Sequence, residues 1–236
     1  TGWVLGNYAF IRTLDGGGSW IGEEYTNLTF YRKDIHAMSN SVAWIVGGSS
    51  SYLWLSRLTI NPDDTIYEHI YLITVSGQML YGVDFIDADN GWAVGTDGRI
   101  MRLTSASTTL KFTWQTSGTT NWLQDIQMLD ANTGYIVGYG GVILKTTDGG
   151  ANWVPQTSGV LVDLYALNFI DTNTGMAVGD DGTILSTTDG GETWLPETSG
   201  VTLDLRDVCM NNSGNAFTVG EAGTILYRTT ITDSTP

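Results

Sequence analysis

The chain is poor in cysteine, proline and positive charge, and each shortage excludes something. Cys209 is the single cysteine among 236 residues, so no intrachain disulfide can form. Ten Lys and Arg stand against 25 Asp and Glu, a formal net charge of −15. That balance argues against unaided binding to nucleic acid, because phosphate contacts need basic side chains. No apolar run is long enough to span a membrane, and no segment has sustained helical periodicity.

The composition nevertheless describes a globular chain. Hydrophobic residues make up 42% and charged residues 15%, which is enough apolar surface for a core. Thirty glycines beside four prolines indicate many tight turns between short strands. The acidity fits an extracytoplasmic protein, whether periplasmic, lumenal or secreted. The sequence opens inside a repeat and holds no signal segment, so we expect that an upstream segment has been removed.

A short motif, Gly-aromatic-x-Val-Gly or a close variant, recurs through the whole sequence. Its final glycines are separated by 41, 48, 43, 41 and 41 residues, and they are Gly6, Gly47, Gly95, Gly138, Gly179 and Gly220. This period matches one four-stranded blade of a β-propeller.

The clearest repeat divides into four short apolar segments separated by turn signals. They cover residues 164–171, 175–179, 182–189 and 192–198. We therefore predict an all-β propeller of four-stranded blades over residues 1–230, with a tail or linker at 231–236. The first repeat lacks its inner strand and the last lacks a clear fourth strand. The terminal blades are thus expected to be incomplete, and six and seven blades both stay open.

Three turns share the pattern Ser/Thr-x-Asp-x-Gly-x-x-Trp. They are TLDGGGSW (13–20), TTDGGANW (146–153) and TTDGGETW (187–194). This pattern resembles the Asp-box, or BNR repeat, and the full repeat looks most like the photosystem II stability/assembly factor-like propellers. The likeness is weakest over residues 48–77, where the box is lost, and in the third repeat, which lacks Asp-Gly-Gly.

The resemblance implies a non-catalytic scaffold without a cofactor, which binds a protein partner. That partner would be a membrane-associated complex or, because of the basic residues described below, an acidic segment. Asp-boxes also occur in sialidases, xyloglucanase-type glycosidases and sortilin-type receptors, so the box indicates architecture better than function. Two alternatives stay open. One is a propeller that binds or hydrolyses glycans, and the other is a propeller module of a larger cell-surface or adhesin protein.

The box residues themselves are predicted to be structural. Asp can accept hydrogen bonds from downstream amides, Gly supplies positive φ, and Trp can fold over the hairpin. Identical groups on separate blades lie far apart, whereas a glycosidase needs two carboxyls within about 5–10 Å. The set comprises Asp15, Gly17, Trp20, Asp148, Gly150, Trp153, Asp189, Gly191 and Trp194.

Two other sets of residues are candidates for partner binding. Basic side chains occupy one position of the third strand in four consecutive repeats, at Arg12, Arg57, Arg102 and Lys145. They form either a basic arc that attracts an acidic segment, or side chains whose long aliphatic parts cover the junctions between blades. A second position, at the start of the inner strand, varies between blades and holds Lys33, Tyr81, Gln124, Tyr165 and Arg206. These residues are either a recognition surface or ordinary solvated loop ends.

Residue types associated with catalysis show no useful pattern. Cys209 lies in an apolar inner strand, where we expect a small buried hydrophobe rather than a nucleophile. His36 and His69 lack metal-ligand spacing, so we expect neither a metal site nor a catalytic site.

Overall fold

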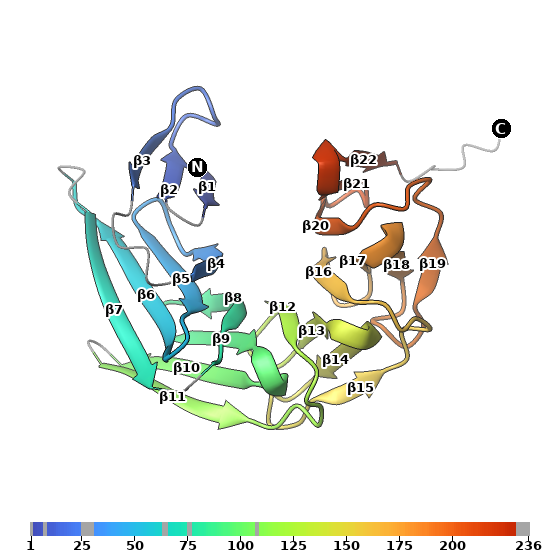
Figure 1. Cartoon of the computed structure of the whole chain (residues 1–236), viewed down its shortest axis with the longest axis horizontal. Helices are drawn as coiled ribbons and strands as arrows, with labels where there is room; N and C mark the ends of the chain where they lie inside the picture. Colours follow the sequence, from blue (N-terminus) through green and yellow to red (C-terminus); the bar gives the residue numbers. More distant parts are fainter. Residues whose placement is uncertain are drawn as a thin grey trace. The chain divides into compact units, whose positions relative to one another are not determined.

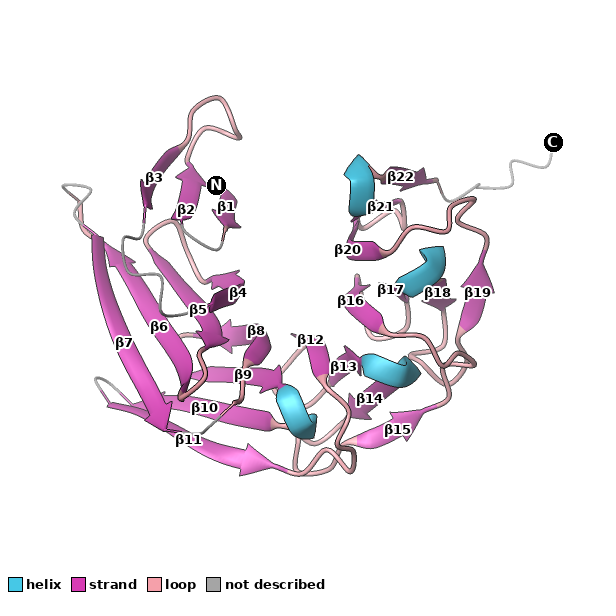
Figure 2. Ribbon diagram, viewed as in Figure 1, coloured by secondary structure: helices cyan, strands magenta, loops and turns pink. Residues whose placement is uncertain are grey.

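The computed structural model describes residues 2–6, 9–24, 31–62, 66–74, 77–106 and 109–229. Its elements are 22 strands and four short 3-10 turns, arranged as antiparallel sheets (Figures 1 and 2). In the part of the chain that the structure describes, no helix has the length and apolarity needed to cross a bilayer. The predicted tail, 231–236, lies outside the described residues.

The chain divides into two compact units, residues 1–115 and 116–236. In the first unit, sheets form in sequence order and each strand pairs with the one before it. Blade 1 is β1 (Gly2–Leu5), β2 (Ala9–Thr13) and β3 (Ile21–Glu24). Blade 2 is β4 (Tyr31–Ala37), β5 (Val42–Gly48), β6 (Tyr52–Ile60) and β7 (Ile66–Thr74). Blade 3 is β8 (Leu80–Asp87), β9 (Asn90–Gly95), β10 (Ile100–Ala106) and β11 (Thr109–Gln115).

The second unit repeats the same sheet three times. Blade 4 is β12 (Leu123–Met128), β13 (Gly134–Gly138), β14 (Val142–Thr146) and β15 (Val154–Gln156). Blade 5 is β16 (Leu164–Phe169), β17 (Gly175–Gly179), β18 (Ile184–Thr187) and β19 (Leu195–Glu197). Blade 6 is β20 (Leu205–Met210), β21 (Ala216–Gly220) and β22 (Ile225–Arg228).

The six sheets make an all-β, six-bladed propeller with three-stranded terminal blades, which confirms the predicted fold class. Blade 1 begins at the strand that comes second in the other blades, because β1 holds the first repeat motif. Blade 6 ends after its third strand among the described residues. The boundary of one domain at residue 230 stays a prediction.

The repeat that lost its Asp-box compensates with longer strands. Strands β6 and β7 are nine residues each and pair along their full length, from Tyr52↔Thr74 to Ile60↔Ile66. The long hairpin supplies buried Leu53 and Leu55 to the core that blade 2 shares with blade 3. In this repeat, backbone pairing between β6 and β7 and burial of their side chains therefore take the place of the side-chain hydrogen bonds of an Asp-box turn.

The cores lie between the faces of successive blades. In blades 2 and 3, the Trp44 ring stacks on Phe85 with centroids 4.9 Å apart. In blades 4 and 5, Tyr135 stacks on Phe169 at 3.8 Å. The aromatic residue of the repeat motif thus lies against the inner strand of the following blade, which explains why it recurs.

In blades 2 to 6, the glycine that ends the motif is required by close contact with the chain at the start of the inner strand of the same blade. Gly95 has extended backbone, with φ −171°, so conformational freedom does not explain it. A Cβ at Gly95 would collide with the carbonyl oxygen of Met79, and one at Gly179 with that of Asp163. Among the described residues, the nearest atom to a Cβ at Gly6 is the carbonyl oxygen of Ala9, at 3.5 Å.

Candidate partner-binding site

A β-bulge marks the start of all five inner strands. In each, the pairing with the second strand skips one residue, as between Leu164 and Ala166. The skipped residues are Lys33, Tyr81, Gln124, Tyr165 and Arg206. A bulge bends the strand and re-aims the side chain of the extra residue. The structure therefore places the variable residues of the sequence at one repeated irregularity, which we call the bulge positions.

In the first unit, the bulge residue Lys33 lies near two tyrosine rings. The ammonium of exposed Lys33 lies 5.6 Å from the ring centroid of Tyr81 and 6.0 Å from that of Tyr31. These distances are within the range of cation–π attraction. The two bulge residues Lys33 and Tyr81 therefore form one continuous surface across blades 2 and 3.

In the second unit, a row of rings crosses blades 4, 5 and 6. Trp122 stacks on Tyr139 with centroids 5.3 Å apart, and Tyr139 meets the edge of Tyr165 at 6.2 Å. The guanidinium of Arg206 lies 4.1 Å from the Tyr165 ring. The two bulge residues Tyr165 and Arg206 thus extend an aromatic surface that begins at exposed Trp122.

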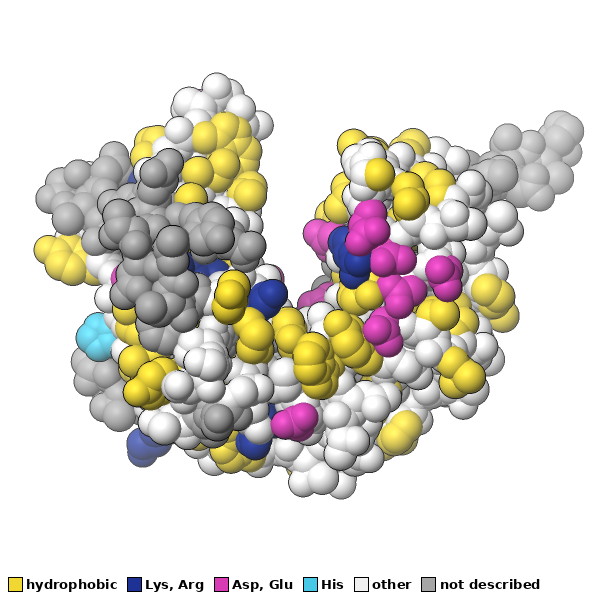
Figure 3. Space-filling view, viewed as in Figure 1, with side chains coloured by type: hydrophobic (Ala, Val, Ile, Leu, Met, Phe, Trp, Pro, Cys, Tyr) yellow, Lys and Arg dark blue, Asp and Glu magenta, His cyan; other side chains and the backbone are white. Residues whose placement is uncertain are grey.

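Carboxylates surround this row and already balance its cation. Arg206 donates to Asp204 at 2.7 Å and to Glu221 at 2.5 Å, and Tyr165 donates to Asp180 at 2.5 Å. Burial and the bond to Asp180 raise the pKa of Tyr165. Burial alone would lower the pKa of Arg206, but its bonds to Glu221 and Tyr165 raise it overall. Figure 3 shows Asp and Glu side chains (magenta) gathered around dark blue basic atoms at β16–β21.

Asp163 and Asp204, which each come just before an inner strand, accept hydrogen bonds from turns of the preceding blade. Asp163 accepts a hydrogen bond from the Gly140 amide at 2.8 Å, and Asp204 accepts one from the Asp181 amide at 3.2 Å. Both amides belong to the 3-10 turns that follow the second strand, Tyr139–Gly141 and Asp180–Gly182. The turns that carry Tyr139 and Asp180 are therefore fixed from the neighbouring blade.

The predicted basic arc consists of side chains engaged in internal contacts. Arg12 is 4% exposed and donates to the Asn40 carbonyl at 3.4 Å. The guanidinium of Arg102 lies 3.9 Å from the Trp92 ring, and the Lys145 ammonium donates to the Gly190 carbonyl at 2.6 Å.

Each basic residue of the arc pairs across the sheet with the motif aromatic, as Arg57 does with Trp44. Arg57 also lines a cavity of about 200 Å³ with Met38 and Trp44. These contacts favour the second interpretation of the arc, in which the aliphatic parts of the basic side chains pack on the blades. Binding of an acidic segment by the arc stays a prediction.

The Asp-boxes use both oxygens of each carboxylate within the turn. Asp189 accepts from the Thr187 hydroxyl at 2.8 Å, the Thr193 amide at 3.0 Å and the Thr193 hydroxyl at 2.5 Å. The Thr187 hydroxyl also accepts the Gly191 amide at 2.9 Å, where φ is +82°. The bonds from Thr193 and Thr187 lower the pKa of Asp189 to about 2. Such contacts support the structural interpretation of the box.

The other two boxes repeat this arrangement. Asp15 accepts from Thr13 and from both the amide and the hydroxyl of Ser19, and Asp148 makes the corresponding bonds with Thr146 and Asn152. In both cases these hydrogen bonds, led by the Ser19 amide and the Asn152 side chain, lower the pKa of the carboxyl. Their tryptophans differ in exposure: Trp153 and Trp194 are 6% exposed, whereas Trp20 is 45% exposed.

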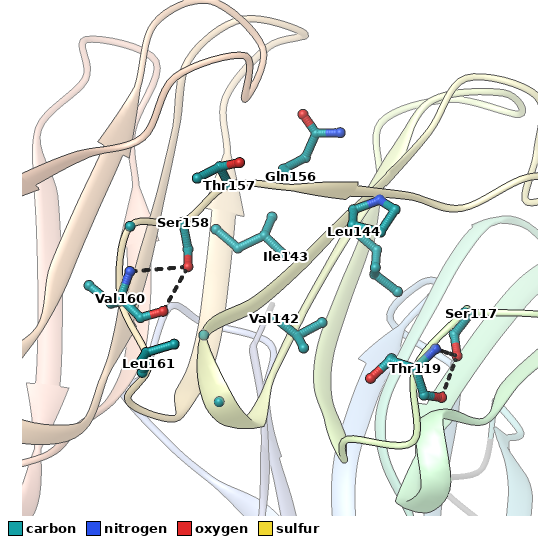
Figure 4. A pocket seen from close by; sticks show the side chains of 15 residues that line it. Ser117, Thr119, Val142, Ile143, Leu144, Gln156, Thr157, Ser158, Val160 and Leu161 are labelled. Atoms are coloured by element: carbon teal, nitrogen blue, oxygen red, sulfur yellow. Dashed lines mark hydrogen bonds between the residues drawn. The ribbon is translucent and has the colours of Figure 1, made fainter.

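A groove of about 490 Å³ opens beside blade 4, where the sequence analysis expected nothing (Figure 4). It lies between β14 and the segment from Gln156 to Leu161. A smaller groove of about 390 Å³ occupies the corresponding place on blade 5, around Thr198 and Ser199. Because the groove recurs with the repeat, it follows from blade geometry. The Ser158 hydroxyl at its wall bonds the backbone of Val160, as Ser199 does with Val201.

The expectation that Cys209 is buried is wrong. Its side chain is exposed, because it points from β20 to a face of blade 6 that no other described sheet of its own unit covers. Among the described residues, no three His, Cys, Asp or Glu side chains form a group that could hold a metal ion.

Comparisons with known proteins agree with the observed architecture. No protein-family model and no curated protein matches the sequence. A structure of YCF48 from Cyanidioschyzon merolae matches with a TM-score of 0.71 and 18% identity, over 95% of this chain and 78% of that one. YCF48 bound to D1 peptide matches with a TM-score of 0.65 and 18% identity, over 85% of this chain. The WD40 β-propeller domain of Doa1 matches at 0.63 and 13%, over 83% of this chain and 64% of that one.

These matches establish the propeller fold. The likeness to YCF48 covers most of the chain, which confirms at the level of the fold the resemblance that the Asp-box repeat indicated. The chain spans 64% of the length of the peptide-bound YCF48 chain. At 18% identity the likeness concerns the fold alone, so the partner and the location outside the cytoplasm stay predictions.

Proposed function

We propose that this propeller is a non-catalytic scaffold that binds a segment of a partner protein at its bulge positions. The observation that carries the proposal is the recurrence of one bulge in five consecutive blades with four different kinds of side chain, Lys, Tyr, Gln and Arg. A constant backbone that presents varied residues is how repeat folds build recognition surfaces. A fold shared with YCF48, of which one structure is bound to D1 peptide, is consistent with this role.

The row in the second unit has the chemistry of a protein-binding surface. Tyr, Trp and Arg combine large buried area with hydrogen bonding, and they dominate binding energy in interfaces. Trp122, Tyr139, Tyr165 and Arg206 each contact the next residue of the row, so little side-chain freedom is lost when a partner binds. Because Asp204 and Glu221 already neutralise Arg206, this part of the surface favours a partner segment that is not itself acidic.

The experiment is photo-crosslinking in extract of the native source, followed by affinity measurement with the purified captured protein. A photoreactive residue replaces Tyr165 in one variant and exposed Leu161, in the outer loop of the same unit, in the control. We expect capture only from position 165. Tyr165→Ala should then weaken the affinity at least about ten-fold, the typical effect of removing an aromatic anchor, whereas Leu161→Ala should leave it unchanged. Equal effects of the two substitutions would refute the proposal.

Glycan binding is the second candidate, since exposed Trp122 stacked on Tyr139 provides a flat aromatic platform of the kind that sugar rings use. A glycan array probed with the parent chain and with Trp122→Ala distinguishes the two. A glycan signal that Trp122→Ala removes, without protein capture at position 165, would favour this candidate. An extracytoplasmic location is part of our proposal, and fractionation of the native source tests it.

A further inference from the structure

The Asp-box turn of blade 5 fills a space at the junction between blades 4 and 5. The carbonyl oxygen of Gly190 in that turn accepts hydrogen bonds from the Tyr135 hydroxyl at 2.8 Å and from the Lys145 ammonium at 2.6 Å. A Cβ added to Gly190 would lie 2.8 Å from the carbonyl oxygen of Thr172. Three residues of the two blades, Tyr135, Lys145 and Thr172, therefore surround one carbonyl-bearing residue of the turn.

The junction between blades 2 and 3 has the same three positions but no Asp-box turn. The repeat identifies these positions as the motif aromatic, its basic partner across the strands, and the third residue after the phenylalanine that stacks on that aromatic. In blades 2 and 3 they are Trp44, Arg57 and Ala88. Blade 3 has no Asp-Gly-Gly between its third and fourth strands, whose pairing continues to Ala106↔Thr109.

The cavity of about 200 Å³ described above lies at these three positions. Its described lining residues all belong to the first unit. The lining combines apolar side chains with one hydroxyl and one cation: Met38, Val42, Trp44, Ala88, Ser39 and Arg57. The space that the Gly190 turn fills between blades 4 and 5 is therefore a cavity between blades 2 and 3.

Arg57 differs from the rest of the basic arc in the contacts of its charged group. The other three members donate to main-chain carbonyl oxygens. Within the described part of the chain, the half-buried guanidinium of Arg57 has no hydrogen-bond or ion-pair partner. Asp87, next to Ala88, directs its carboxylate to the Asp89 amide and the Asn90 side chain instead. A partly desolvated cation of this kind favours a ligand that supplies acceptor oxygens.

We propose that this cavity binds a small carboxylate whose carbon skeleton is apolar. The carboxylate pairs with the planar guanidinium of Arg57, which matches two oxygens at once, and takes the place that the Gly190 carbonyl has in the other junction. The carbon skeleton contacts Met38, Val42 and the Trp44 ring. The cavity volume corresponds to about seven water molecules of roughly 30 Å³ each, so a branched acid of similar size fits.

The lining distinguishes this ligand from other anions. Arg57 is the one cation among the described lining residues, and the chain carries a net charge of −15, so a monoanion is favoured over phosphate or sulfate. The apolar walls favour a carbon skeleton over a bare hydrated ion. The cavity lies at the ends of the inner strands β4 and β8, whereas the bulge positions lie at their starts. The proposal therefore does not depend on the function proposed for the bulge positions.

Titration with isovalerate, a branched carboxylate of suitable size, tests the proposal. Nitrogen-15 NMR spectra follow the Arg57 Nε–H and the Trp44 indole N–H, and we expect a dissociation constant of the order of millimolar. Isovaleramide has the same shape without the charge and should bind at least about ten-fold more weakly. Formate lacks the apolar skeleton and should lose at least as much. Absence of binding, or equal binding of isovalerate and its amide, would overturn the proposal.

Variants locate the binding at this cavity. Arg57→Gln should weaken isovalerate binding at least about ten-fold, measured on the Trp44 signal. Lys111→Gln is the control, because it removes the charge of an exposed residue of the same unit outside the cavity lining and should leave the affinity unchanged. If Arg57→Gln does not fold, Ala88→Leu decides. It replaces an exposed loop residue, reduces the cavity and should weaken binding by a similar factor; an affinity equal to that of the parent would refute the proposal.

Two peptides distinguish the sources of the carboxylate. The tripeptide Gly-Gly-Val ends in an apolar residue with a free carboxylate, and its C-terminal amide lacks that charge. Tighter binding of the free tripeptide than of isovalerate, lost on amidation, would identify a chain terminus as the ligand. Tighter binding of isovalerate would identify a free acid, and both results support a carboxylate site.

Discussion

Replacing Gly95 by Ala should destabilise the first unit strongly, although alanine can adopt the backbone conformation found there. Gly95 has φ −171°, which is ordinary extended backbone. The added Cβ would collide with the Met79 carbonyl oxygen and lie 3.0 Å from the Cα of Leu80. To relieve this collision, β9 must move away from the bulge at the start of β8. Overpacking of this kind costs about 1–3 kcal/mol.

The movement also loosens hydrogen bonds that cross the same point. The Thr96 amide donates to the Met79 carbonyl at 3.0 Å, and the Met79 amide donates to the Thr96 hydroxyl at 3.1 Å. Each bond contributes about 1 kcal/mol. The expected loss is therefore about 2–5 kcal/mol in the free energy of unfolding, which is large against the total stability of a small domain.

Gly6→Ala is the matched control, because Gly6 ends the same motif in the same unit. In the part of the chain that the structure describes, blade 1 has three strands and no inner strand, and the atom nearest to the new Cβ lies at 3.5 Å. We expect a change within about 0.5 kcal/mol. Urea unfolding followed by tryptophan fluorescence measures both variants. If Gly6→Ala costs as much as Gly95→Ala, the motif glycine reflects local conformation and the contact argument is wrong.

Three further predictions concern individual side chains. Burial raises the pKa of Asp34 to about 6 from 3.8, so its contribution to stability is complete below about pH 4 and is lost as the pH rises through 6. The stability of Asp34→Asn relative to the parent should therefore rise between pH 4 and 7, by at most roughly 3 kcal/mol; a flat difference in urea melts would contradict this. Tyr135→Phe removes the bond to the Gly190 carbonyl at 2.8 Å and should cost about 1 kcal/mol, because Lys145 still bonds that oxygen; an unchanged urea midpoint would count against it. Asp189→Ala should lower the urea midpoint without affecting partner affinity, and a loss of affinity in a folded variant would argue that the box binds.

The fold could be predicted from the sequence because the blades share the same kinds of short-range contact. Asp-Gly-Gly turns, motif glycines and motif aromatics each make a contact that recurs at the same place in several blades. The degenerate repeat over residues 48–77 was harder, since its long hairpin is stabilised by ladder pairing that leaves no short motif. The incomplete terminal blades followed from the position of the motif within the first and last repeats.

The candidate site was predictable only as a set of positions. Variation within a constant frame located Lys33, Tyr81, Gln124, Tyr165 and Arg206, and the structure places all five at the same bulge. The bulge itself has no sequence signature. The row that links Trp122 and Tyr139 to Tyr165 joins side chains of two blades, so local sequence does not reveal it. The internal contacts of the basic arc could have been inferred from the sequence. Each of its four basic residues occurs in a repeat whose motif has an aromatic residue, and the two residues pair across neighbouring strands.

The blade period, the strand order and the turns could be predicted from the sequence, because they depend on contacts within one repeat or between adjacent repeats. Which of the equivalent residues are buried became visible only in the folded structure. Met176 and Phe217 hold the same place in the repeat, yet one is 1% and the other 53% exposed. Whether a side chain is buried depends on which sheet packs against its face of the blade. The repeat sequence specifies the residues of that face but not the sheet that packs against it. The same reason left Cys209 exposed, where an apolar strand had indicated a buried side chain.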